Sequence, residues 1–221
     1  MITAKKKFLQ LIINDFKLEW KQRHSFFGLV LYCAATIFIS YLSFRQSIDA
    51  VTWNALFWII MLFASVNALA KSFLSESRGR QLYFYTLVSA PVYFLSKLLY
   101  GIILMVLLSM ISLFIYSALN GFPSTEVISF VLTVIVGSTG LAVTLTMISA
   151  IASRSGSQTS LMAILGFPVL IPMLIIIIKL SAKAIEGISI LDSSREIILL
   201  SALIALTSAL SYILFPYIWR E

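Results

Sequence analysis

The stretch KSFLSESRGRQLYFYTLVSAP, Lys71 to Pro91, separates two long hydrophobic segments and decides how the chain is organised. Its charged residues are interleaved with aromatic and aliphatic ones, so it is too long for a tight turn and too apolar for a solvated linker. This pattern favours a short amphipathic helix lying at a membrane surface. Two interpretations stay open: the segment offers a docking face to a cytosolic partner, or it only anchors its neighbours in the interface.

The composition on either side of this segment indicates a membrane protein. Hydrophobic residues make up 60% of the chain and charged residues 11%, whereas an ordinary soluble domain carries about 25% charged residues. Within lipid, only helices and closed barrels satisfy their own backbone hydrogen bonds. Barrel strands would alternate polar and apolar residues over about ten positions. The apolar runs here are continuous and longer, which predicts an all-α, polytopic membrane protein.

The hydrophobic runs predict six transmembrane helices within one transmembrane domain, residues 1–221. A helix needs about 20 apolar residues to cross the hydrocarbon core. The predicted spans are 25–44, 51–70, 92–119, 127–153, 159–178 and 197–219. They are preceded by a basic amphipathic helix over residues 4–24, on which Phe8, Ile12, Phe16 and Trp20 share one apolar face.

Two longer connections join these spans. Residues 71–91 form the coupling segment on one side of the membrane. Residues 179–196 form a segment on the other side, where Ala184, Ile185, Ile188 and Leu191 are expected to line one face of a short surface helix.

Lysine and arginine fix the expected orientation. With the N-terminus inside, twelve of the sixteen cations fall on the inner side and four on the outer side. The outer four are Arg45, Lys179, Lys183 and Arg195. Both termini are therefore predicted to be cytoplasmic. This bias also accounts for the net charge of +7, so the charge gives no reason to expect nucleic-acid binding.

The sequence contains few residues that could carry out catalysis. No phosphate-binding loop of the GxxxxGK[ST] kind occurs, and no span carries a pair of acids. The single cysteine, Cys33, lies inside a span and is expected to be an apolar packing residue. His24 is open to two interpretations, a haem ligand or pH sensor and an interfacial polar residue; the second is favoured because no second ligand is near in sequence. We expect no catalytic residues, no metal site and no directly bound cofactor.

Polar and small residues inside the spans are interpreted mainly as packing features. Asn54 and Asn67 are expected to form hydrogen bonds between helices rather than contact a substrate. Small side chains in the fourth span let neighbouring helices approach closely. The small residues are Gly137, Ser138, Gly140, Ala142 and Thr144.

Pro168 and Pro172 stand four residues apart in the fifth span, within GFPVLIPM. Each removes a backbone donor and disturbs the preceding turn. The pair predicts a bend in this helix, either as a fixed shape, which we favour, or as a moving part.

Three motifs carry a resemblance to a known family. The first is FLSESRGRQLYFYTLVSAPVYFLSK, Phe73 to Lys97; the second is the Arg154-Ser-Gly156 turn; the third is GFPVLIPMLIII, Gly166 to Ile177. With the six-span layout and the length, they make the chain similar to the membrane subunits of ABC-2 class exporters. More narrowly, the chain resembles cytochrome c maturation protein B, the haem exporter B family.

The resemblance implies a role in an ATP-driven transporter complex of the bacterial inner membrane. A separate cytoplasmic ABC ATPase subunit would bind ATP and dock on the coupling segment. The implied docking residues are Phe73, Glu76, Arg78, Gly79, Arg80, Leu82 and Tyr83. The other implied partners are further cytochrome c maturation membrane proteins, a second copy of the chain, and lipid.

ATP hydrolysis would be coupled to haem export or to release of a haem-loaded periplasmic chaperone. Haem is implied in the complex, and the resemblance leaves open whether it meets this chain. Two alternatives from the residues stay open: an ABC-2 permease for a lipid or another hydrophobic cargo, and a non-transporting membrane scaffold.

Overall fold

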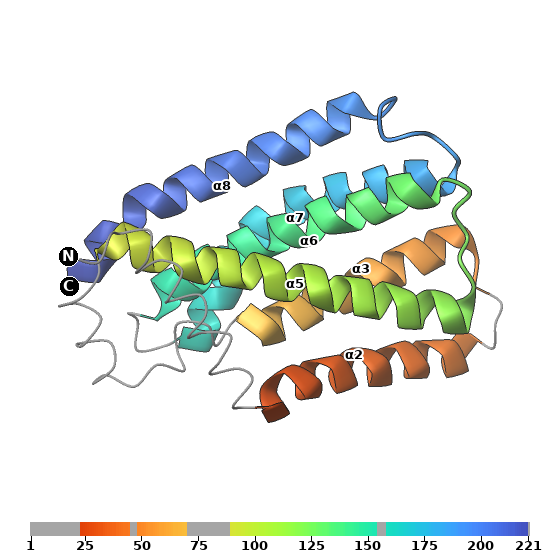
Figure 1. Cartoon of the computed structure of the whole chain (residues 1–221), viewed down its shortest axis with the longest axis horizontal. Coiled ribbons are helices and arrows are strands. Elements are labelled where there is room, and N and C mark those ends of the chain that lie inside the picture. The colour runs from red at the N-terminus through yellow and green to blue at the C-terminus, as the bar shows by residue number, and fades with distance from the viewer. Residues whose placement is uncertain (1–22, 45–47, 70–88, 154–157, 221) are drawn as a thin grey trace, which may run out of the picture.

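Six helices form the regular structure of the described residues. A computed structural model describes residues 23–44, 48–69, 89–153 and 158–220. The helices are α2 (Arg23–Phe44), α3 (Ala50–Leu69), α5 (Ala90–Asn120), α6 (Val127–Ala152), α7 (Gln158–Ile185) and α8 (Ser194–Arg220). Figure 1 shows them running along one long axis. All six are long and apolar enough to cross a membrane, which confirms the predicted all-α fold with six spans.

The helices alternate in direction, so the bundle has two ends (Figure 1). At the first, called the Ala90 end, α2, α5 and α7 begin and α3, α6 and α8 finish. At the second, called the Gly121 end, the other helix termini meet. The predicted interfacial helix and coupling segment fall mostly in 1–22 and 70–88, outside the described residues.

The connection between α7 and α8 differs from the prediction. Helix α7 continues to Ile185, and only residues 186–193 separate it from α8. Gly187, at φ +85°, ends α7: its N–H donates to the Ala184 carbonyl at 3.3 Å, and the Ile188 N–H donates to the Lys183 carbonyl at 2.9 Å. This is the glycine-terminated Schellman arrangement. The predicted short surface helix is therefore wrong, because Ala184 and Ile185 belong to α7 and 186–193 form turns.

Local sequence explains where two other helices begin. Asp49 caps α3, accepting the Thr52 N–H on Oδ2 at 3.2 Å and the Trp53 N–H on its carbonyl at 2.9 Å. Hydrogen bonds from the Thr52 side chain and then its backbone lower the pKa of Asp49. Ser89 is extended before α5, and Pro91 occupies its first turn, where a missing N–H costs no helical hydrogen bond.

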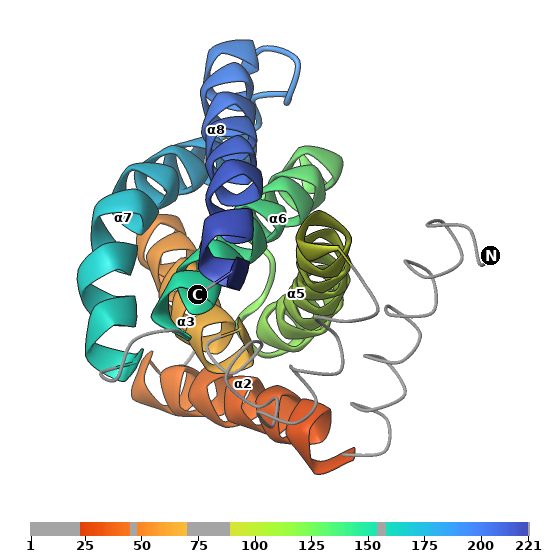
Figure 2. The same cartoon turned by 90° about the vertical axis from the view of Figure 1, so that its left-hand side faces the viewer.

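Helix α6 lies at the centre of the bundle. In the most apolar 18-residue stretch of α6, 61% of the residues are buried. The corresponding share is 11% for α2 and 17% for α8. Figure 2, turned by 90°, shows α2 and α8 on opposite sides of the bundle. The two most exposed helices are therefore attached to a core of α3, α5, α6 and α7.

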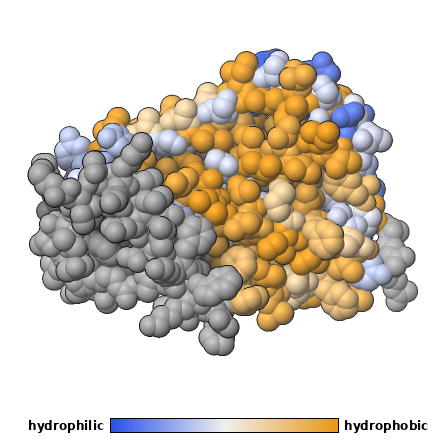
Figure 3. All heavy atoms as spheres, in the orientation of Figure 1, coloured by the Kyte–Doolittle hydropathy of each residue, from blue (hydrophilic) through white to orange (hydrophobic). Residues whose placement is uncertain are grey.

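The outward faces of the helices form a broad apolar surface. Figure 3 shows this surface along the helices, with hydrophilic residues collected where α8 begins. Large apolar side chains on it are well exposed, including Leu31, Phe114 and Ile128. A surface of this kind fits a hydrocarbon environment, so lipid is the solvent of these faces.

The small-residue stretch of α6 lets two neighbouring helices approach closely. A Cβ added at Gly137 would lie 2.7 Å from Cη2 of Trp58 and 3.0 Å from Cγ2 of Ile177. One added at Gly140 would lie 2.8 Å from Sδ of Met173. The α3–α6 and α6–α7 contacts thus depend on missing side chains, which confirms the packing interpretation.

We expect Gly137→Ala to lower the thermal stability of the purified chain. The added methyl group meets the Trp58 ring, and overpacking of this kind typically costs about 1–3 kcal/mol. The measurement is the melting temperature in detergent, followed by size-exclusion chromatography after heating.

Gly28→Ala is the matched control. No atom lies within 4 Å of a Cβ at Gly28 on α2, and alanine favours a helix interior by about 0.5–1 kcal/mol. The control should melt at or above the wild-type temperature. Equal melting of the two variants would contradict the close approach at Gly137.

Candidate functional site

The predicted docking residues Phe73, Glu76, Arg78, Gly79, Arg80, Leu82 and Tyr83 lie outside the described residues. Their assignment stays a prediction. The described chain resumes at Ser89, and α5 starts at the next residue. The predicted docking segment therefore continues directly into the first turn of α5.

A buried polar cluster of Asn54, Trp58 and Ser181, called the α3–α7 node, joins the interior faces of α3 and α7. The Ser181 hydroxyl donates to Oδ1 of Asn54 at 2.7 Å and accepts from Nε1 of Trp58 at 2.9 Å. Nδ2 of Asn54 donates to the Ile178 carbonyl at 3.0 Å. All three side chains are at most 2% exposed. The node stabilises the contact because the Trp58 indole N–H and the Asn54 amide would otherwise lose these partners in an apolar interior.

The two asparagines of α3 differ in their partners. Asn54 forms hydrogen bonds between helices, as predicted. Asn67 is exposed, and its Nδ2 donates to the Phe63 carbonyl of its own helix at 3.1 Å. The prediction of an interhelical bond at Asn67 is therefore wrong. Asn67 lies near the Ala90 end of α3, where its side chain points out of the bundle.

Pro168 and Pro172 both lie inside α7, with their side chains on its exposed face. The predicted bend at these residues stays a prediction. On the interior face, Leu170, Met173 and Ile177 are buried. The node at Ser181 fixes the part of α7 between the prolines and the Gly121 end.

Aromatic side chains fill the core near the Gly121 end. Nε1 of Trp53 donates to the Gly121 carbonyl at 3.0 Å, and the Tyr116 hydroxyl donates to the Trp53 carbonyl at 3.2 Å. The centroids of the Trp53 and Tyr116 rings are 4.6 Å apart. Phe57 and Phe130 pack on the same rings. These contacts connect α3, α5 and α6.

An ion pair and hydrogen bonds also hold the α7–α8 connection in place at the Gly121 end. Nζ of Lys183 and Oε1 of Glu196 form an ion pair at 2.7 Å. The Ser124 hydroxyl donates to the Ala184 carbonyl at 2.7 Å, and the Ile190 N–H donates to Oγ of Ser129 at 3.1 Å. The end of α7, the start of α8 and the α5–α6 connection therefore form one hydrogen-bonded cap.

Near the Ala90 end, Lys97 is a buried cation, 6% exposed, on α5. Its Nζ lies 5.8 Å from the centroid of the Tyr93 ring, within the range of a cation–π contact. Across the described part of the chain, no three His, Cys, Asp or Glu residues converge on a point that could hold a metal ion. The described polar and aromatic contacts join the helices to one another.

The family comparison covers almost the whole chain. The family model described as CcmB protein matches residues 6–218. The chain belongs to the CcmB protein family. Membership confirms the resemblance seen in the sequence and makes the chain a membrane component of a haem-export complex in cytochrome c maturation. No curated protein matches the chain.

Sequence reasoning missed the central residue of the α3–α7 node, Ser181. The predicted fifth span ended at residue 178, so Ser181 was assigned to the outer segment. Gly187 was the signal that would have placed it, because a glycine after an apolar helix commonly marks its end. Trp58 carried no visible signal, since its partner is far away in the sequence.

We expect Ser181→Ala to weaken the α3–α7 contact. The change removes one acceptor and one donor, leaving Nε1 of Trp58 and Oδ1 of Asn54 with one partner fewer. Hydrogen bonds between membrane helices average about 0.6 kcal/mol and reach about 1.7 kcal/mol. Reversible unfolding in mixed micelles should show a loss in this range for each bond.

Ser201→Ala is the control for this change. Ser201 is exposed on α8 and bonds the Ile197 carbonyl of its own helix at 2.7 Å. Its loss should leave the free energy of unfolding nearly unchanged. A Ser181→Ala chain as stable as the Ser201→Ala chain would show that the node contributes nothing.

Proposed function

We propose that this chain is the transmembrane subunit of an ATP-driven complex for cytochrome c maturation. A separate subunit hydrolyses ATP, and this chain couples hydrolysis to haem export or to release of a haem-loaded periplasmic chaperone. The observation that carries the proposal is the match to the CcmB protein family over residues 6–218. The chain itself catalyses no reaction in this scheme.

The charge and aromatic pattern of Lys71–Pro91 supports a docking role for that segment. It connects α3 to α5 at the Ala90 end, and its Arg78, Arg80 and Glu76 sit among aromatic residues. An amphipathic segment of this kind presents charged groups for specificity and aromatic rings for contact area. The proposed binding partner is a cytoplasmic ABC ATPase.

The remaining partners follow from the same scheme. Other cytochrome c maturation membrane proteins and a second copy of the chain complete the complex, and lipid covers the free apolar faces. ATP is bound by the ATPase, and no cofactor is bound directly by this chain. The complex lies in the bacterial inner membrane, with both termini and the Ala90 end in the cytoplasm.

Charge changes in the coupling segment test the ATPase assignment. We expect Glu76→Lys or Leu82→Asp to abolish co-purification of an ABC ATPase with the tagged chain in mild detergent. Each change removes a contact that the proposal places at the ATPase surface. Mass spectrometry of the eluate identifies the recovered proteins, and a haem stain reports haem in the complex.

Glu186→Lys is the matched charge reversal at the Gly121 end, where Glu186 is exposed. It should leave ATPase recovery unchanged. Normal recovery with both docking variants would disprove the docking site. An ATPase recovered without cytochrome c maturation proteins would instead favour a permease with another cargo, and no ATPase at all would favour a scaffold.

Membrane orientation is tested by labelling single cysteines. The native Cys33 is 1% exposed, so it gives little background. Leu191→Cys, at an 83% exposed position of the Gly121 end, should react with a membrane-impermeant maleimide in intact spheroplasts. Ser89→Cys, at the Ala90 end, should react only after permeabilisation. The reverse labelling pattern would overturn the cytoplasmic assignment of the Ala90 end.

A further inference from the structure

Three aromatic residues at the Ala90 end, Tyr93 and Phe94 of α5 and Phe215 of α8, form a small cluster that we call the aromatic joint. The Phe215 ring centroid lies 4.9 Å from that of Phe94 and 6.3 Å from that of Tyr93. All three residues are at most 4% exposed. With Ala90 and Ala150 they make a hydrophobic cluster separate from the main core. The joint therefore attaches the first turns of α5 to the last turns of α8.

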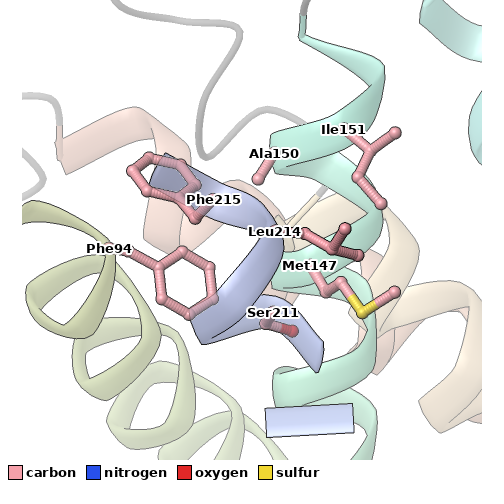
Figure 4. A pocket seen from close by; sticks show the side chains of 7 residues that line it. All are labelled: Phe94, Met147, Ala150, Ile151, Ser211, Leu214 and Phe215. Atoms are coloured by element: carbon pink, nitrogen blue, oxygen red, sulfur yellow. The ribbon is translucent and has the colours of Figure 1, made fainter. Parts of the chain in front are cut away.

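A shallow hollow lies against this joint. Figure 4 shows Phe94, Ser211 and Phe215 beside it, with Met147, Ala150 and Ile151 of α6 on its other side. The empty volume of about 170 Å³ includes space open to the surroundings, and the hollow is too narrow to hold a water molecule. The hollow therefore offers no free space into which the Phe215 ring could move, and the rings of the joint are packed against their neighbours.

Helix α8 depends on a narrow line of contacts elsewhere. Its buried side chains are Leu200, Thr207, Ser211 and Phe215, which follow one face of the helix. Its opposite face carries exposed apolar residues such as Ile198, Leu206 and Ile213. At the Gly121 end the Lys183–Glu196 ion pair holds it to α7. Among the α8 side chains that the structure describes, the Phe215 ring is the large apolar group buried at the Ala90 end.

Phe215 packs on the first turn of α5, and this position links the ends of α5 and α8. Helix α5 is continuous from Ala90 to Asn120, so helical hydrogen bonds join its first turn to the turns that follow. A side chain packed on that first turn moves with it, because close-packed interiors transmit displacements. Phe215 is such a side chain, and Pro216 follows it inside α8, where the helix lacks one backbone donor.

We propose that Phe215 is a positioning residue for the transport cycle. A displacement of the start of α5 passes through the packed rings of the aromatic joint to the end of α8, which moves with α5 relative to α6 and α7. The proposal rests on the proposed function in one respect: the ATPase acts on the segment that leads into α5. The joint itself is made only of described residues.

The first test compares Phe215→Leu and Phe94→Leu with Tyr212→Leu in the whole complex. Tyr212 is a 48% exposed aromatic on α8 and serves as the matched control. The readout is cytochrome c formed per ATP hydrolysed, measured beside complex assembly. We expect the two joint variants to assemble and hydrolyse ATP while this ratio falls by about fivefold or more, the lower range of coupling between sites.

The double variant separates transmission from simple destabilisation. Phe94 and Phe215 contact each other, so Phe94→Leu/Phe215→Leu should lower the ratio no further than either single change. Independent structural damage would multiply the two losses. A wild-type ratio in Phe215→Leu, or equal loss of assembly and ratio in both joint variants, would overturn the proposal.

The second test follows the helices directly. Spin labels at Leu99 of α5, Leu210 of α8 and Ile175 of α7, all exposed, report pairwise distances in the complex with and without ATP. In the wild-type chain, the Leu99–Leu210 distance should stay constant while the Leu210–Ile175 distance changes. In Phe215→Leu the Leu99–Leu210 distance should vary. An α8 that stays fixed relative to α7 would disprove transmission through the joint.

Failure of the proposed function gives a different result. If the wild-type chain recovers no ATPase, the labels are measured in lipid nanodiscs without nucleotide. There Phe215→Leu should broaden the Leu99–Leu210 distance distribution, and Tyr212→Leu should leave it unchanged. Identical distributions would overturn the joint independently of any ATPase.

Discussion

The approach of α6 to its neighbours at Gly137 is the contact on which the bundle depends. Because Gly137 has no Cβ, the Trp58 ring packs closely against α6, and the Ile177 side chain packs beside it. Trp58 then lies where its indole N–H meets Ser181. A single absent methyl group thus allows both the apolar packing of three helices and the polar node that fixes α3 to α7.

The two ends of the bundle are built differently. The Gly121 end is closed by hydrogen bonds, an ion pair and a group of packed aromatic rings, which together join α3, α5, α6, α7 and α8. The Ala90 end has a separate apolar cluster with a hollow beside it. The directional polar contacts of the Gly121 end resist displacement of the helices that they join.

The fold class followed from the sequence because lipid restricts the choice of structure. Continuous apolar runs allow only helices, and the number and order of the spans needed no long-range information. The end of α7 was misplaced because Lys179 and Lys183 looked like the start of a polar loop. The structure keeps both lysines helical, and Lys183 is paired with Glu196, whose distance in sequence hid the partnership.

The site was less predictable for a physical reason. Asn54 could be recognised as needing a partner, but its sequence does not show whether that partner lies on α7, on another helix or in a substrate. Asn67 presented the same chemistry and bonds its own helix instead. Phe94 and Phe215 are ordinary apolar residues in the sequence, and only the meeting of α5 with α8 gives them a shared role. Neither the polar residues of α3 nor the aromatic joint identifies a substrate. Family membership is what links the chain to haem export.

The length of α5 links this protein to the thickness of its bilayer. Its 31 residues extend about 46 Å at 1.5 Å per residue, whereas a hydrocarbon core is about 30 Å thick. Hydrophobic mismatch costs a fraction of a kcal/mol per Å, and α5 experiences more of it than the 20-residue α3 beside it. Lipid composition sets the bilayer thickness and therefore affects the tilt of this helix. A thinner bilayer favours conformations in which α5 is more inclined to the membrane normal.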